Sequence, residues 1–261
     1  MGGASSEGSE ARFATYVEAL GAVLGHADRR EPMRDYCLGL LMPIARKSVE
    51  PMAAVTAPAQ VAAKHQSLLH FVGNAPWSDA AMLAKVSELV LPAIERSGPV
   101  EAWIIDDTGF PKKGQHSVGV TRQYCGQLGK RDNCQVAVTL SLANHHASLP
   151  VAYRLYLSED WAEDRARRDK ARVPETIAFQ TKPEIAFEQI KAARSAGLPC
   201  GDAPRAHAAG APPTPPLPPD SSELTTYWRP LLRNGYIGSA VPWSSQKSVL
   251  MIRICGLGRR N

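Results

Sequence analysis

The 261-residue chain lacks a hydrophobic segment long enough to cross a membrane. No apolar run approaches the roughly 18 residues that a membrane-spanning helix needs. Its first residues, MGGASSEGSEARF, contain no apolar core of a secretory signal. Five cysteines, an odd number, are scattered without the paired spacing of a disulfide framework. We therefore expect a cytoplasmic protein without a membrane partner.

The chain also lacks an excess of basic charge outside its last segment. Its net charge is +5, and residues 203–261 contain seven Lys and Arg against two Asp and Glu, so residues 1–202 are neutral. Overall charge therefore does not indicate nucleic-acid binding by the body of the chain, and that function must be argued from local residues. With 44% hydrophobic residues, the chain has enough apolar content for a folded core.

The first part of the chain has the hydrophobic spacing of helices. Apolar residues recur at helical intervals through residues 10–96. Ser78 is a candidate N-cap for the last of these helices, and Pro92 is expected to kink or end it.

From residue 99 the pattern becomes that of a mixed α/β unit. A short apolar run at 100–105 and an alternating pair of segments within 134–157 predict a strand and a hairpin, and 118–124 is a further strand or an extended loop. The sequence TKPE at 181–184 has the form of a capping box and starts a helix that Gly197 ends.

After this helix the expected apolar strand does not arrive. Residues 203–219 contain seven prolines and cannot form a helix or a strand. Two explanations fit: a Pro-rich linker with a small appendage, or an out-of-frame translation of GC-rich coding sequence. A third interpretation gives the stretch TPPLPP at 214–219 a protein-binding role as a polyproline II ligand.

Two adjacent carboxylates, Asp106 and Asp107, follow the apolar run, where we expect the exposed end of a strand. Hard cations such as Mg²⁺ bind through one or two carboxylates with phosphate oxygens and water. Alternatively, the two carboxylates are simply exposed to water at the end of a strand and bind no ligand. Lys112 and Lys113 come next and would suit DNA phosphates, or they belong to an ordinary solvated turn. The mixed charges of residues 161–172 favour a solvated face, whose arginines would contact phosphates if nucleic acid binds.

Three other kinds of functional site, a phosphate loop, a dinucleotide-binding site and a zinc site, are excluded because their sequence motifs are incomplete. Gly109 and Gly114 have the spacing of a phosphate loop, but Gln and His follow instead of Lys and Ser or Thr. The stretch GQLGK at 126–130 lacks the dinucleotide-binding fingerprint. Cys125 and Cys134 have no second ligand pair at zinc spacing.

The string WIIDDTGFPKKG at 103–114 closely resembles bacterial insertion-sequence transposases, the DDE-type enzymes with a ribonuclease-H-like catalytic domain. Further matching strings are SVGV, RQYCGQLGK, NCQ, LYL, VPE and QTKPE, which extend to about residue 201. The resemblance implies a helical DNA-binding region at 1–98 and a partial ribonuclease-H-like domain at 99–201. Residues 202–261 would form an irregular tail, disordered or out of frame.

In such enzymes two Asp and one Glu hold the divalent cations, Mg²⁺ or Mn²⁺, that drive strand cleavage and strand transfer. The first Asp corresponds here to Asp106, because related motifs read Asp, any residue, Thr, with Asp107 as the fallback. The other two carboxylates have no counterpart: Asp202 has no strand before it, and Glu223 lies in low-complexity sequence. The resemblance therefore implies an inactive copy, whose sheet lacks a central strand and keeps an unpaired edge.

The resemblance also implies partners. These are double-stranded DNA at the terminal repeats and target sites, and a second copy of the chain, since element ends are paired; the protein would be nucleoid-associated. An alternative function is that of a non-catalytic fragment that occupies element ends and inhibits an intact transposase. The basic residues expected to contact DNA are Lys112, Lys113, Arg122, Lys130, Arg165 and Arg168.

Overall fold

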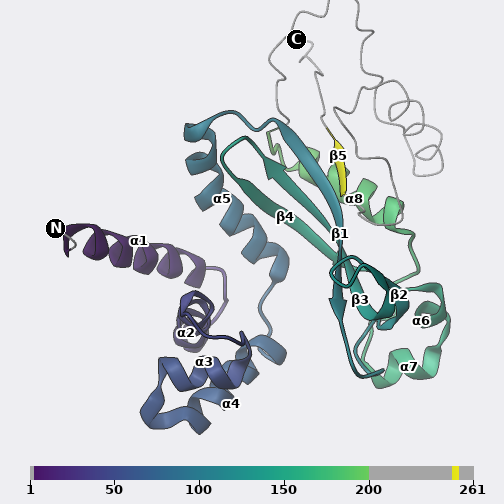
Figure 1. Ribbon diagram of the computed structural model, residues 1–261, viewed down its shortest axis with the longest axis horizontal. Helices are drawn as coiled ribbons and strands as arrows, with labels where there is room; N and C mark the ends of the chain where they lie inside the picture. The colour runs from purple at the N-terminus through teal and green to yellow at the C-terminus, as the bar shows by residue number, and fades with distance from the viewer. Residues whose placement is uncertain (1–2, 200–248, 253–261) are drawn as a thin grey trace, which may run out of the picture. The chain divides into compact units, whose positions relative to one another are not determined.

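The computed structural model describes residues 3–199 and 249–252, and the chain divides into two compact units, Met1–Val90 and Leu91–Asn261 (Figure 1). The first unit is helical and the second holds a β-sheet with helices, which confirms the mixed α/β class. The predicted domain limits at 98/99 and 201/202 stay predictions. The Pro-rich stretch 203–219 lies outside the described residues. Within the described ranges, no helix combines the length and hydropathy needed to traverse a bilayer.

The regular elements described in the first unit are all helical, as the periodicity over residues 10–96 predicts. The Ser78 hydroxyl accepts a hydrogen bond from the amide of Ala81 at 3.2 Å, as expected of an N-cap. Pro92 does not end its helix, which continues to Ser97. The elements are α1 (Gly3–Gly21), η1 (Ala27–Arg29), α2 (Arg30–Leu41), α3 (Val49–Thr56), η2 (Pro58–Gln60), α4 (Val61–Gly73) and α5 (Asp79–Ser97), of which α5 continues past Val90 into the second unit.

The core of the first unit forms where apolar stripes of these helices meet. The Trp77 ring stacks on Phe71 with centroids 5.6 Å apart, and its indole N–H donates to the Phe71 carbonyl at 2.8 Å. This satisfied indole fixes the segment between α4 and α5 against the core. The buried residues of the cluster are Val17, Leu20, Leu24, Met33 and Phe71.

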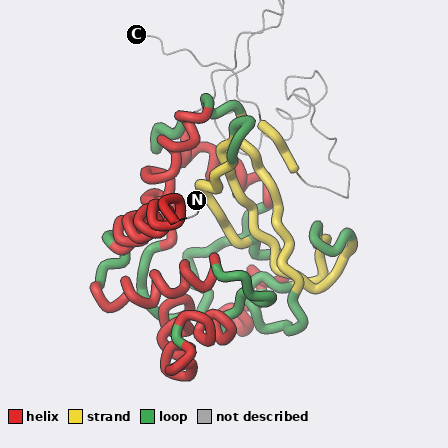
Figure 2. The backbone as a smooth tube through the Cα atoms, turned by 60° about the vertical axis from the view of Figure 1, so that its left-hand side comes forward, coloured by secondary structure: helices red, strands yellow, loops and turns green. Residues whose placement is uncertain are grey.

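The strands described in the second unit form an antiparallel sheet, coloured yellow in Figure 2. The strand order is β2-β3-β1-β5, and β4 pairs with β3 on the same edge as β2. The hairpin predicted within 134–157 is confirmed as β3 and β4. The strands are β1 (Ala102–Pro111), β2 (Thr121–Cys125), β3 (Lys130–Ala143), β4 (Ser148–Leu155) and β5 (Val249–Ile252), with α6 (Glu159–Glu163) and α7 (Arg165–Lys170) after β4.

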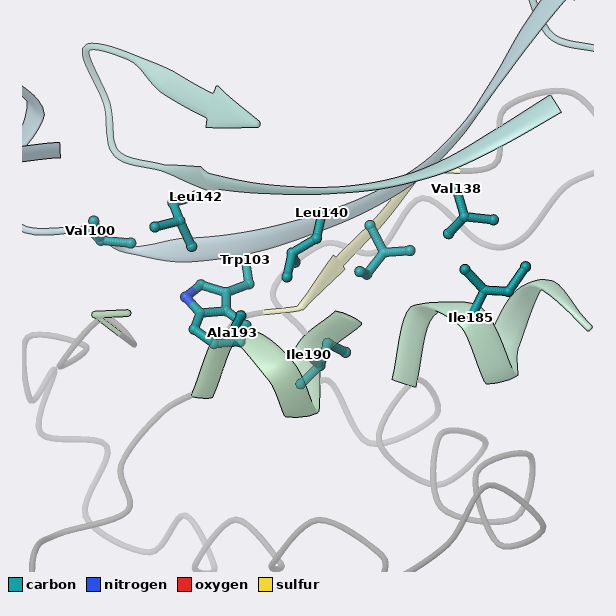
Figure 3. Packing of buried hydrophobic residues seen from close by; sticks show 9 residues of the cluster. Val100, Trp103, Val138, Leu140, Leu142, Ile185, Ile190 and Ala193 are labelled. Atoms are coloured by element: carbon teal, nitrogen blue, oxygen red, sulfur yellow. The ribbon is translucent and has the colours of Figure 1, made fainter. Parts of the chain in front are cut away.

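Helix α8 (Lys182–Ser195) covers one face of this sheet, which we call the helix face. The predicted capping box is present, with the Thr181 amide donating to the Glu184 carboxylate at 2.7 Å. Gly197 follows the helix with a φ of 70°, the left-handed conformation expected of a glycine C-cap. Figure 3 shows the packing between sheet and helix. The buried residues labelled there are Val100, Trp103, Val138, Leu140, Leu142, Ile185, Ile190 and Ala193.

The sequence predicts an unpaired edge where the sheet lacks a central strand, and the edge of β1 beyond β3 is partly covered instead. Val249–Ile252 pairs antiparallel with β1 from Trp103 to Asp106. The prediction of an unpaired edge is therefore wrong for this part of β1, because a short segment from the far end of the chain supplies backbone partners.

Candidate functional site

Asp106 and Asp107 lie in the middle of a long strand rather than at its exposed end. Strand β1 continues to Pro111, and the continuation stays paired with β3 as far as Cys134. The predicted position at a strand end is therefore wrong. The apolar run at 100–105 includes only the first part of β1, the part whose side chains pack in the core.

The two carboxylates belong to opposite faces of the sheet, because successive side chains of a strand alternate. Asp107 is opposite Val138, a member of the core under α8, so it lies on the helix face. Asp106 is opposite Thr139 on the other face, which we call the Asp106 face. Neighbouring carboxylates on opposite faces cannot both ligate one ion.

Asp107 has a cationic partner within the fold. The Nζ atom of Lys182, the first residue of α8, lies 2.5 Å from Asp107 Oδ2, and the two side chains are 26% and 17% exposed. The same ammonium group lies 5.5 Å from the Tyr156 ring centroid. The negative charge of Asp107 is thus compensated by a residue 75 positions away in sequence.

Asp106 has a different environment. Partial burial, and then the charge of Asp107, raise the pKa of Asp106 above that of an ordinary aspartate. Among residues 3–199, no lysine, arginine or histidine forms an ion pair with it. The Thr139 hydroxyl donates to the Asp106 carbonyl at 3.3 Å, which ties the backbone rather than the carboxylate. A divalent cation would stabilise a charge held in this way.

The lysines of the motif lie on an anchored segment after β1. The Asn133 side-chain amide donates to the carbonyls of Lys112 and Gly114, at 2.7 and 2.9 Å. The segment is therefore held by its backbone, while Lys112 and Lys113 are exposed. Both side chains are available to phosphates.

The strands contribute two more of the predicted DNA contacts. Arg122 is exposed on β2. Lys130, the first residue of β3, is also exposed and forms an ion pair with Asp132 at 3.0 Å. Register places Arg122 opposite Asn133, so Arg122 belongs to the same end of the sheet as the lysine segment.

Arg168 is used inside the fold. Its guanidinium donates to the carbonyls of Ala162, Pro174 and Ile177 at 3.0, 3.0 and 2.7 Å. Arg165 is exposed, with a carboxylate oxygen of Glu175 at 3.9 Å. The structure thus places Arg165 at the surface and gives Arg168 an evident role in the turn after α7.

The residue that sequence reasoning missed in this region is Trp161. It is fully buried, its indole N–H donates to the Val120 carbonyl at 2.8 Å, and the Arg167 guanidinium lies 3.8 Å over its ring. Arg167 also donates to the Gln115 carbonyl at 2.8 Å. The stretch 161–172 is therefore not a purely solvated face. The presence of a tryptophan in this charged stretch was the sequence signal that part of the stretch is buried.

A metal site would need ligands beyond Asp106. The part of the chain that the structure describes contains no group of three His, Cys, Asp or Glu side chains placed to hold a metal ion. Asp202 and Glu223 lie outside that part. Asp106 suits a Mg²⁺ or Mn²⁺ ion as one oxygen ligand, with water and phosphate oxygens completing its shell. It does not by itself suit a pair of ions.

Comparison with known proteins gives two matches. The family described as DDE superfamily endonuclease matches residues 19–201, well over half of the chain. A protein of Microchaete diplosiphon, named as the probable transposase for insertion sequence element IS701, is 31% identical over 161 residues. That match covers 62% of this chain, which spans 38% of the length of the relative. No solved structure matches the chain.

Proposed function

The chain belongs to the DDE superfamily endonucleases, and from this premise we propose that it is an insertion-sequence transposase, or a part of one, that binds double-stranded DNA. Asp106 is its first metal ligand, and the chain on its own does not cleave DNA. The observation that carries the proposal is the position of Asp106. It lies in the motif, half-buried on the face opposite α8, and has no cationic partner among the described residues.

Asp107 serves the fold rather than the metal. A cation that bound Asp107 would have to displace the Lys182 ammonium group and enter the helix face, which is filled by the buried core. A cation at Asp106 displaces no such group. This difference supports Asp106, with Asp107 as the fallback that the experiment below tests.

The proposed lack of cleavage rests on how few carboxylates the described residues bring to Asp106. When bound, divalent cations in a two-metal site activate the attacking oxygen and stabilise the leaving oxygen of a phosphoryl transfer. Mg²⁺ gives up its waters reluctantly and needs several fixed ligands. Asp106 supplies one, and Asp107 faces away. In this proposal Asp106 holds one ion weakly, and Lys112 and Lys113 contact neighbouring phosphates.

Metal binding and cleavage test the proposal separately. Titration of the full chain with Mn²⁺, followed by electron paramagnetic resonance, is expected to show weak binding that is lost in Asp106→Asn and kept in Asp107→Asn. The reverse pattern would transfer the role to Asp107. Supercoiled plasmid incubated with the chain and Mg²⁺ or Mn²⁺ is expected to stay intact. Nicking above the level of Asp106→Asn would contradict the proposed inactivity.

A second function follows from the same reasoning, and the extent of the family match favours it. Because the match begins at residue 19, it includes most of the helical first unit, whose predicted role is DNA binding. A chain that binds element ends without cutting would inhibit an intact transposase. Co-expression with an active relative should lower its transposition frequency, and an unchanged frequency would count against this role. Pairing of two copies remains a prediction, which sedimentation with terminal-repeat DNA would check.

A further inference from the structure

The strand register gathers basic side chains on the same face as Asp106. Residues directly opposite each other in an antiparallel pair share a face, and the face alternates along each strand. On β3, Thr139 lies on the same face as Asp106. Every second residue of β3 shares that face, which therefore includes Asn133 and Arg131. Arg122 of β2 is opposite Asn133. Arg131, which sequence reasoning did not single out, therefore joins Arg122 on the Asp106 face.

This face carries charge of one sign apart from Asp106. In the described strands β1 to β4, the other acidic side chains are Asp107 and Asp132, and alternation assigns both to the helix face. Lys130 pairs with Asp132 there. Arg122 and Arg131 are exposed, and neither forms a salt bridge with another described residue. Asp132 is held mainly by Lys130, whose hydrogen bond is the largest cause of the lowered pKa of that carboxyl, and the charge of Arg122 contributes less. Neither arginine is therefore engaged in a direct ion pair within the described residues.

The segment that carries Lys112 and Lys113 is fixed at the same end of this face. Asn133, which is opposite Arg122 and two residues from Arg131, holds the carbonyls of this segment through its side-chain amide. Gln135, two residues along the same face, donates to the Val118 carbonyl at 2.6 Å. Arg167 holds the carbonyl of Gln115. A segment fixed by its backbone loses little conformational freedom when its side chains bind a ligand.

We propose that Arg122, Arg131, Lys112 and Lys113 form one phosphate-binding surface, the basic end of the Asp106 face, along which double-stranded DNA lies to reach Asp106. The inference rests on the proposed function and deepens it, since it assigns a DNA path to the proposed metal ligand. Six residues of extended chain separate Asp106 from Lys112, which is about 20 Å. That length equals roughly six base pairs, so one short duplex contacts both ends of the face.

DNA binding without divalent cations tests this surface independently of metal chemistry. The full chain is titrated against a labelled 30-base-pair duplex in EDTA, by fluorescence anisotropy, over a range of KCl concentrations. Each lost phosphate contact lowers the slope of log Kd against log salt by about 0.9. Arg122→Ala with Arg131→Ala should lower the slope by about two and raise Kd at least about tenfold at 0.1 M salt.

Two control pairs separate this surface from general charge. Lys191→Ala with Arg194→Ala removes two exposed positive charges from α8, on the opposite face, and should leave the slope unchanged. Arg122→Lys with Arg131→Lys should keep the slope, because lysine retains the phosphate contact. Equal slopes for the wild type and the double alanine variant, or an equal loss in the α8 pair, would overturn the inference while leaving DNA binding intact. A wild-type chain that binds no duplex would overturn the proposed function as well.

Discussion

Removal of the Lys182 ammonium group should destabilise the sheet, because it leaves the Asp107 carboxylate partly buried on the helix face without its cation. The Lys182–Asp107 distance is 2.5 Å, and the side chains are 26% and 17% exposed. Exposed ion pairs contribute about 0.2–1 kcal/mol, whereas losing one partner of a buried pair costs about 3–5 kcal/mol. The intermediate exposure indicates a loss of about 2 kcal/mol for Lys182→Met.

The assay is urea unfolding at pH 7 as a double-mutant cycle, followed by tryptophan fluorescence, which reports on the buried Trp103 and Trp161. Asp107→Asn and Lys182→Met should each destabilise the chain. The double variant should be more stable than the sum of the two losses by about 1 kcal/mol or more. Lys191→Met, on the exposed side of the same helix, should change stability by less than about 0.5 kcal/mol. Additive losses would refute the assignment of Asp107 to the fold.

Three further predictions concern single side chains. Because burial raises the pKa of Asp106, ionisation disfavours the folded state. Asp106→Asn should therefore gain stability over the wild type as pH rises from 3 to 7 in urea unfolding, and a constant difference would contradict this. Thr181→Ala removes the capping box and should cost about 1 kcal/mol, whereas Thr181→Ser should be nearly neutral. Burial, with nearby Cys125, raises the pKa of Cys134 to about 11, so iodoacetamide at pH 8 should alkylate Cys134 far more slowly in the folded chain than in urea. Equal rates would show that the thiol is accessible.

The features that sequence reasoning predicted correctly depend on neighbours in the chain. The capping box needs Thr181 and Glu184, three residues apart, and both of its hydrogen bonds form. The hairpin needs two alternating segments and a polar turn, in which the Asn144 side chain accepts from the amides of His146 and Ala147. Such signals lie within one short window, so the sequence contains the whole cause.

The features that sequence reasoning missed depend on contacts between segments that are distant in the chain. Lys182 is the first residue of a helix and shows no sign in the sequence of a partner on β1. Arg168 resembles a surface arginine until the carbonyls of Pro174 and Ile177 turn back toward it. The partner of the β1 edge comes from Val249–Ile252, far along the chain. Periodicity cannot identify such partners, because it reports which face is buried and not what covers it.

The acidic motif combines residues that are needed for separate physical reasons. Alternation sends Asp106 to the face that carries the basic end and Asp107 to the face that carries α8, where Lys182 compensates it. Gly109 is needed for space: a Cβ there would lie 3.0 Å from Cys125 Sγ and 3.1 Å from Cys125 Cα. The string resembles one chemical site in the sequence. In the fold, one of its acids is half-buried without a cationic partner among the described residues, the other pairs with Lys182 of α8, and its glycine allows β1 to approach the end of β2.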